Sequence, residues 1–302
     1  MRRKCTDSLI YWKKNPGRKP LILQGLRQTG KTWLLMDFGN KQYEHTLYIN
    51  LETDRSATDY LSVPHDPQEV LLFLETCAGK PLRPASSLLI LDNIQCIPQI
   101  STLLTSIALD FPQYHIASIY KGVVNSDSFS VHDFDILTLY PLDFEEFLWA
   151  KGYSEKHIED ILKHMQTGTP FSETELSVYK KLFLEYCVLG GMPAVVKVYI
   201  ERNLFTDTLE IQRQIQMDYE EDIRKYAEGL EQTKIVSVYR NVPVQLAKEN
   251  KKFQLSKIDK KARSREYMGC ITWLEDAGVI SVCYCLQYPE LPLKAVSYTH
   301  LR

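Results

Sequence analysis

The stretch Gly25-Leu26-Arg27-Gln28-Thr29-Gly30-Lys31-Thr32 decides the fold of this chain. It fits the pattern G-x-x-x-x-G-K-[ST], whose glycines let the backbone curl until successive N–H groups point inward at a phosphate. A strand-like run at residues 20–24 precedes it and a helical run follows it. The N-terminal partial positive charge of that helix adds to the attraction for an anion. The stretch therefore predicts a phosphate-binding loop.

The loop residues have expected roles in binding ATP and Mg²⁺. Lys31 is expected to be a catalytic cation that sits solvated in the free loop and reaches the β- and γ-phosphates, and the Thr32 hydroxyl is expected to ligate Mg²⁺. For Arg27, contact with a phosphate and a solvent-facing position are both compatible with the sequence. The residues that we expect to contact the nucleotide are Gly25, Leu26, Arg27, Gln28, Thr29, Gly30, Lys31, Thr32 and Trp33.

A buried strand that ends in an acidic residue is the expected partner of this loop. Residues 88–92, Leu-Leu-Ile-Leu-Asp, fit it, and we expect Asp92 to hold Mg²⁺ through its water shell. The next residue, Asn93, takes the catalytic position at which many ATPases place a Glu that polarises the attacking water. An amide can orient a water but cannot accept its proton. Asn93 therefore argues against fast hydrolysis.

The first 150 residues alternate short apolar runs with helical patterns. Helical spacing occurs at residues 33–38, before a stop at Gly39, and at 68–77. This alternation predicts an α/β P-loop NTPase fold with a mostly parallel sheet flanked by helices. Asn50 and Glu52 end the second strand on the ligand side, as plain polar strand ends by default or as catalytic or water-positioning groups. The predicted strands are residues 20–24, 46–51, 87–91, 114–119 and 135–140.

The pattern changes along the rest of the chain. After a capping box at Asp143 and Glu146, residues 151–240 are helical, with one break at 190–193. The order of elements in residues 241–290 is that of a winged helix, with a helix capped by Ser264 and a strand at 279–286. The sequence thus predicts four parts. They are a P-loop domain at 1–150, a helical segment at 151–240, a winged-helix-like segment at 241–290, and the start of a truncated C-terminal domain with a possible foreign tail at 291–302. One face of the capped helix carries Tyr267, Cys270, Ile271 and Leu274.

Composition and charge limit the classes of partner. Apolar residues make up 44% of the chain, enough for a sizeable core, and the net charge of −2 gives no global attraction to nucleic acid or membrane. No apolar run approaches the length of a membrane span. The seven cysteines are scattered without a Cys-x-x-Cys pair, which favours reduced thiols over a metal site. We expect a cytoplasmic protein without a membrane partner, and a homo-oligomer stays open.

One local patch departs from this balance. Eight of the residues between 248 and 265 are Lys or Arg: 248, 251, 252, 257, 260, 261, 263 and 265. Such a patch can contact DNA phosphates, or it can be a protein-contact or solvated surface. The outer face of the helix that would enter a DNA groove is no more than neutral in charge, which favours the protein-contact or solvated surface.

Five stretches together resemble a prokaryotic AAA-type ATPase family whose members carry a C-terminal domain of unknown function 4143. They are GLRQTGKT (25–32), LLILDNIQ (88–95), YPLDFEEFL (140–148), GGMPAVV (190–196) and KIDKKARSREYMGCITWLEDAGVI (257–280). The resemblance implies an N-terminal P-loop ATPase, a helical segment, a winged-helix-like segment and a nuclease-like last domain.

The chain departs from that family at three places. Asn93 replaces the family's Glu, residues 118–119 are Ser-Ile where the family has a Gly-Ser sensor of the γ-phosphate, and residues 132–133 are His-Asp where it often has a basic residue. Ser118 itself can supply the sensor hydroxyl. Two functions remain: an ATPase whose slow hydrolysis drives a conformational switch, or a hydrolysis-deficient P-loop protein that binds DNA or protein through its winged-helix-like segment.

Overall fold

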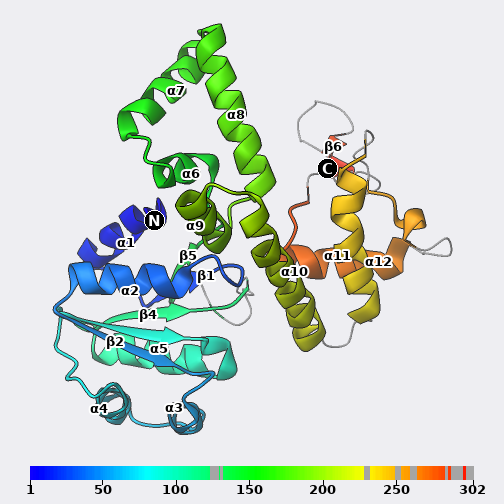
Figure 1. Cartoon of the computed structure of the whole chain (residues 1–302). Helices are drawn as coiled ribbons and strands as arrows, with labels where there is room; N and C mark the ends of the chain where they lie inside the picture. Colours follow the sequence, from blue (N-terminus) through cyan, green and yellow to red (C-terminus); the bar gives the residue numbers. More distant parts are fainter. Residues whose placement is uncertain are drawn as a thin grey trace. The chain divides into compact units, whose positions relative to one another are not determined.

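The computed structural model describes residues 1–122, 129, 132–227, 232–248, 253–258, 264–282, 285–286 and 295–296. A five-stranded parallel sheet forms the centre of the N-terminal part, with the strands in the order β2-β3-β4-β1-β5 (Figure 1). The prediction of a mostly parallel sheet flanked by helices is confirmed. The strands are β1 (Leu21–Gln24), β2 (His45–Asn50), β3 (Ser87–Asp92), β4 (His115–Ile119) and β5 (Asp135–Thr138).

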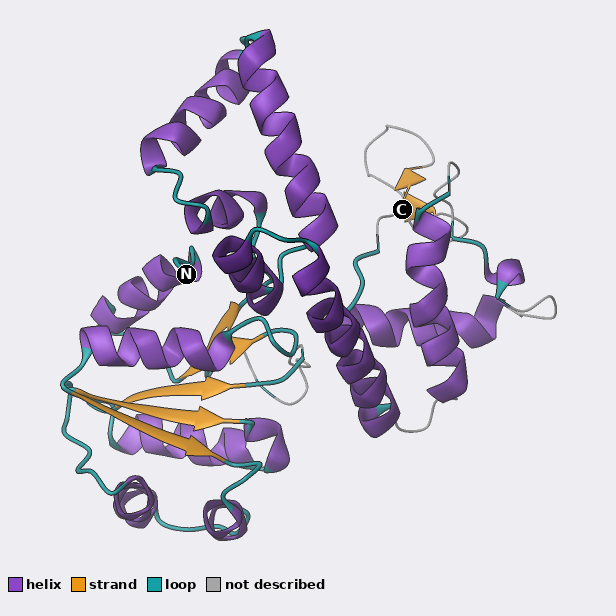
Figure 2. Ribbon diagram, viewed as in Figure 1, coloured by secondary structure: helices purple, strands orange, loops and turns teal. Residues whose placement is uncertain are grey.

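Helices cover both faces of this sheet (Figure 2), which explains why β3 is apolar at every position but its ends. Leu88 and Ile90 point to the face covered by α1 (Cys5–Lys14) and α2 (Lys31–Gln42). Leu89 and Leu91 point to the opposite face, where they join the core residues of three further helices. Those helices are α3 (Arg55–Leu61), α4 (Pro67–Ala78) and α5 (Ile100–Asp110).

The predicted stop at Gly39 is wrong, because α2 continues through it to Gln42. Gly39 is buried, and a Cβ atom at this position would lie 2.5 Å from Oγ1 of Thr46 on β2. A glycine is therefore needed here for the close packing of α2 against the sheet rather than for ending the helix.

The helical part after the sheet begins with α6 (Phe144–Ala150), and its predicted capping box is confirmed. Three longer helices follow, and the break at residues 190–193 is confirmed, because Gly190 terminates α8 and Pro193 opens α9. Leu148, Ile158 and Leu182 form a small core between α6, α7 and α8. The bounds are α7 (Glu155–Thr167), α8 (Glu173–Leu189) and α9 (Pro193–Arg202).

The chain divides into two compact units, Met1–Gln212 and Arg213–Arg302. The division falls within α10 (Thr206–Tyr226), whereas the sequence predicts boundaries at residues 150 and 240. Helices α6 to α9 thus belong to the same unit as the sheet.

The second unit is built around α11 (Gln232–Leu246) and α12 (Ser264–Asp276), with the short helix η2 (Leu255–Lys257). The predicted apolar face of α12 is confirmed, since its four residues are at most 5% exposed in a common core. The strand predicted at 279–286 is shorter: within the described residues only β6 (Cys285–Leu286) is extended, pairing with β7 (Ala295–Val296). The partly buried Val279 and Ile280 pack on the core after α12 instead. No helix among the described residues is long and apolar enough to cross a membrane.

Candidate phosphate-binding site

The predicted phosphate-binding loop connects β1 to the start of α2, as its sequence requires. Gly25 has φ +140° and Gly30, the N-cap of α2, has φ +90°. A Cβ atom on Gly25 would lie 2.3 Å from the carbonyl oxygen of Leu139. Any side chain at residue 25 would therefore collide with the chain after β5, so the glycine sets the path of the loop.

Lys31 is not solvated, contrary to the expectation from the sequence. Its side chain is 5% exposed, and Nζ donates hydrogen bonds to the carbonyl oxygens of Gly25 and Leu26, 2.7 and 2.6 Å away. The Leu26 oxygen also accepts a hydrogen bond from Oγ1 of Thr29 at 3.0 Å. The loop therefore wraps around its own ammonium group.

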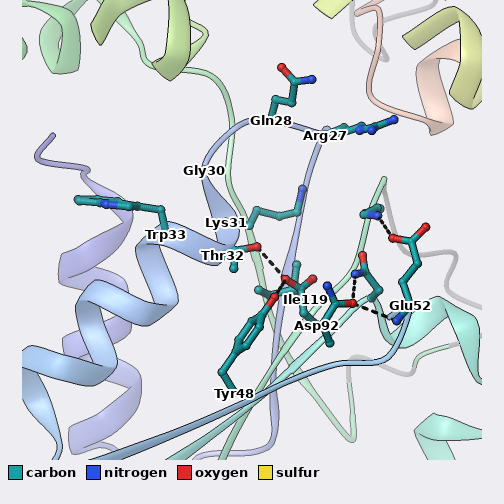
Figure 3. A pocket seen from close by; sticks show the side chains of 13 residues that line it. Arg27, Gln28, Gly30, Lys31, Thr32, Trp33, Tyr48, Glu52, Asp92 and Ile119 are labelled. Carbon is teal, nitrogen blue, oxygen red and sulfur yellow. Dashed lines mark hydrogen bonds and ion pairs between the residues drawn. The ribbon is translucent and has the colours of Figure 1, made fainter. Parts of the chain in front are cut away.

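Thr32 and Asp92 meet at the mouth of the loop, although 60 residues separate them. Oγ1 of Thr32 donates to Oδ2 of Asp92 at 2.8 Å, and the Tyr48 hydroxyl donates to the same oxygen at 2.9 Å (Figure 3). Burial, together with the Asp92 charge, raises the pKa of Tyr48, which stays a protonated donor at neutral pH. Tyr48 was not predicted from the sequence, because only the pairing of β2 with β3 brings it next to Asp92.

These residues line a cavity of about 310 Å³. The predicted contact residues Gly25, Leu26 and Thr29 do not line it. Trp33 does, but its ring is half exposed and directed away from Asp92 (Figure 3). The lining residues are Arg27, Gln28, Gly30, Lys31, Thr32, Trp33, Tyr48, Asn50, Glu52, Asp92, Asn93, Ile119 and Lys121.

Asn93 follows β3 in the left-handed backbone conformation, with φ +62°, and is 2% exposed. Its Nδ2 donates to Oδ1 of Asn50 at 2.7 Å, while its Oδ1 has no hydrogen-bond partner among the described residues. Ser118, the alternative sensor hydroxyl, is fully buried in β4 and does not line the cavity. Its neighbour Ile119 lines the cavity instead.

Two charged side chains complete the edge of the cavity that Asn93 occupies. Oε2 of Glu52, two residues after β2, and Nζ of Lys121, two residues after β4, form an ion pair at 2.5 Å. The sequence indicated Glu52 as a polar strand end by default, with a catalytic or water-positioning role as the alternative. Lys121 was missed, although the rule that ligands gather at the carboxyl ends of parallel strands applies equally to β4.

Arg3 joins the back of the loop to the helical part of the first unit. This buried side chain donates from Nη1 to the carbonyl oxygen of Thr29 at 2.8 Å and from Nε to Oε1 of Glu146 at 3.2 Å. Glu146 is the capping-box residue of α6. Nothing in the sequence relates Arg3 to residues so far along the chain, so this link is visible only in the fold.

The hydroxyl of Thr32 and the carboxylate of Asp92 fit the predicted magnesium site, because Mg²⁺ prefers hard oxygen ligands and keeps several waters. Groups of three or more His, Cys, Asp or Glu residues able to hold a metal ion do not occur in the described part of the chain. A site of one carboxylate and one hydroxyl suits a metal that is also held by phosphates rather than a metal bound by protein side chains alone.

The basic patch predicted to contact DNA or protein falls mostly outside the described residues. Residues 251, 252, 260, 261 and 263 lie there, whereas Lys248, Lys257 and Arg265 are within the described ranges. The patch and the winged-helix-like segment that contains it stay predictions.

The comparisons with known proteins agree with this geometry. Residues 17–148 match the family model of an AAA domain, and residues 180–299 match a domain of unknown function, DUF8612. The expected resemblance to the 4143 family is not shown, since the second match is to a different domain, and that match extends into the segment 295–302. No curated protein is similar to this chain in sequence.

Solved structures are similar at low sequence identity. The Walker-type ATPase PABY2304 of Pyrococcus abyssi is 14% identical, with a TM-score of 0.55 over 92% of this chain and 89% of that one. AMPPCP-bound DnaA from Aquifex aeolicus is 12% identical, with a TM-score of 0.39 over 93% and 91%. The second score is too low to establish a shared overall fold. Residues 17–148 thus match an AAA domain in sequence, and the chain shares the fold of a Walker-type P-loop ATPase.

Proposed function

We propose that this protein binds ATP with Mg²⁺ in the cavity beside the loop and hydrolyses it slowly. The observation that carries the proposal is the meeting of Thr32 Oγ1 and Asp92 Oδ2 at 2.8 Å, beside the buried ammonium of Lys31, in a cavity of about 310 Å³. A metal ligand pair and a phosphate-binding cation at the N-terminus of a helix are the parts that nucleoside triphosphate chemistry requires.

Each side chain has a stated task in this proposal. Lys31 exchanges its hydrogen bonds to the loop carbonyls for phosphate oxygens, and the N–H groups that begin α2 point at the same anion. Thr32 and Asp92 would hold Mg²⁺, which when bound neutralises charge on the phosphate oxygens. Tyr48 keeps the Asp92 carboxylate oriented toward Thr32 through its hydrogen bond.

Two features support slow hydrolysis that drives a conformational switch. Asn93 directly follows Asp92, and its amide side chain cannot accept a proton from the attacking water. Arg3 links the carbonyl of Thr29 to the capping box of α6, so a change in the loop has a direct path to the helical part of the same unit. A partner, DNA or protein, is proposed at residues 248–265 on the strength of their basic sequence.

The test is phosphate release from Mg·ATP by the purified chain. We expect slow release that falls about 100-fold or more in Asp92→Asn, which removes the negative metal ligand. Asp37→Asn, an exchange of the same kind on the solvent side of α2, is the matched control and should leave the rate unchanged. No release above the blank by the wild-type protein, or equal release by Asp92→Asn, would refute the ATPase proposal.

A further inference from the structure

The Glu52–Lys121 ion pair lies within the cavity rather than on an unrelated surface. In the strand order β2-β3-β4, the two residues follow the strands on either side of β3, so they flank Asp92 and Asn93 from both sides. Both line the same cavity as Lys31 and Thr32, and the side chains of Glu52 and Lys121 are 39% and 28% exposed. Figure 3 shows Glu52 on the side of this cavity opposite Trp33. The carboxylate that Asn93 lacks is thus present in the same cavity, in the turn that follows the neighbouring strand β2.

A hydrogen-bond relay connects Asn93 with the backbone of Glu52. Oδ1 of Asn50 accepts one hydrogen bond from Nδ2 of Asn93 at 2.7 Å and another from the backbone N–H of Glu52 at 3.0 Å. The amide of Asn93 therefore fixes the turn that carries Glu52. A glutamate at residue 93 has no N–H₂ group and could not make this bond.

We propose that Glu52 is the carboxylate that orients and deprotonates the attacking water, and that Lys121 contacts the γ-phosphate; this rests on the proposed ATPase function. The water oxygen forms a bond to the γ-phosphorus while the bond from that phosphorus to the β–γ bridging oxygen breaks, and its electron pair leaves with ADP. The water proton passes to the carboxylate of Glu52 and returns to the phosphate product.

The ion pair gives this arrangement a control step. While Lys121 holds Glu52, the carboxylate is neutralised and a poor base. A γ-phosphate entering the cavity competes for the Lys121 ammonium with more charge than one carboxylate, which releases Glu52 to the water. Only the triphosphate carries this group, so Lys121 distinguishes ATP from ADP.

Glu52→Gln tests the base, because it keeps the size of the side chain and removes its proton-accepting capacity. We expect the single-turnover rate to fall about 10²- to 10⁴-fold, while the Kd for Mg·ATP measured by calorimetry stays within about threefold of the wild-type value. Glu44→Gln, just before the opposite end of β2, is the matched control and should change neither quantity. In an Asn93→Glu background, Glu52→Gln should lower the single-turnover rate by less than about tenfold, because the new carboxylate at residue 93 takes the place of the Glu52 carboxylate.

Lys121→Ala tests the γ-phosphate contact by binding alone. We expect the affinity for Mg·ATP to fall about tenfold and that for Mg·ADP to stay the same; equal losses for both nucleotides would overturn the role of Lys121. If Glu52→Gln has the same turnover and affinity as the wild-type protein, Glu52 is not the base. The same conclusion follows if the wild-type protein binds ATP but does not turn it over, and in both cases the proposed nucleotide binding stands. Wild-type protein that does not bind ATP would instead refute the proposed function itself.

Discussion

Replacing Lys31 by alanine removes the ammonium group around which the loop wraps. Its ammonium donates to the carbonyl oxygens of Gly25 and Leu26. Neither oxygen is orphaned by the exchange, because the Gly25 oxygen also accepts from the N–H of Gly122 at 3.0 Å and the Leu26 oxygen from Thr29 Oγ1. We therefore expect the free energy of unfolding to fall by about 1.5–3 kcal/mol, less than the roughly 5–15 kcal/mol of a typical domain, so the variant stays folded.

Nucleotide binding should weaken in this folded variant. A hydrogen bond to a charged group contributes about 1.5–3 kcal/mol. Losing the contact between Lys31 and the phosphates should therefore raise the Kd for Mg·ATP by about 10- to 150-fold. Isothermal titration calorimetry measures this affinity, and urea unfolding measures the stability of the same sample.

The matched control is Lys41→Ala, at the other end of α2. Its ammonium pairs with Asp37 at 2.8 Å on the exposed side of the helix, far from the loop in sequence. It should leave the affinity unchanged. A folded Lys31→Ala protein with a Kd within about threefold of the wild-type value would refute the assignment of this loop as a phosphate site.

Three further predictions concern catalysis, pH and the basic patch. Asn93→Glu should raise the rate of phosphate release by about tenfold or more with little change in affinity, because a carboxylate at residue 93 takes over the role of Glu52 without having to be released from Lys121; an unchanged rate would mean that residue 93 does not limit turnover. Burial lowers the pKa of His115 to about 4, so the contribution of the neutral ring to stability is complete above pH 6.5 and is lost as the pH falls toward 4. In urea titrations over this range, the free energy of unfolding of the wild-type protein should fall by about 1–3 kcal/mol more than that of His115→Gln. An equal fall in both proteins would refute this role of His115. If the patch at 248–265 contacts phosphates, the logarithm of the binding constant for duplex DNA should fall with the logarithm of the salt concentration, with a slope of about 0.9 per contact. In anisotropy titrations, the triple variant with Lys257, Lys260 and Lys261 changed to Glu should lose binding to all DNA sequences alike.

The sheet and the loop could be predicted because their signals are local. The strand from Leu88 to Asp92 is buried on both faces, so its apolar residues are consecutive in the sequence. The pattern of the phosphate-binding loop likewise lies within eight consecutive residues. The capping box of α6 is equally local, since Asp143 and Glu146 bond each other across one turn. Such patterns need no knowledge of the rest of the fold.

The contacts that the sequence did not reveal join distant strands and helices. Tyr48 reaches Asp92, and Glu52 reaches Lys121, only because β2, β3 and β4 are neighbours in the sheet. Arg3 reaches Thr29 from the N-terminal end of α1, across a separation that carries no periodic signal. The stop assigned to Gly39 failed for a related reason, because a glycine that ends a helix and one that packs closely on a strand look alike in sequence.

In the proposed function, Lys31, Thr32 and Asp92 together form a site for a nucleoside triphosphate and Mg²⁺. The most direct measurement is the Kd of the whole wild-type chain for ATP by calorimetry, first with Mg²⁺ and then with excess EDTA. We expect saturable binding at one site that weakens when the metal is removed, since Thr32 and Asp92 then have no cation to hold. The absence of ATP binding under both conditions would contradict it.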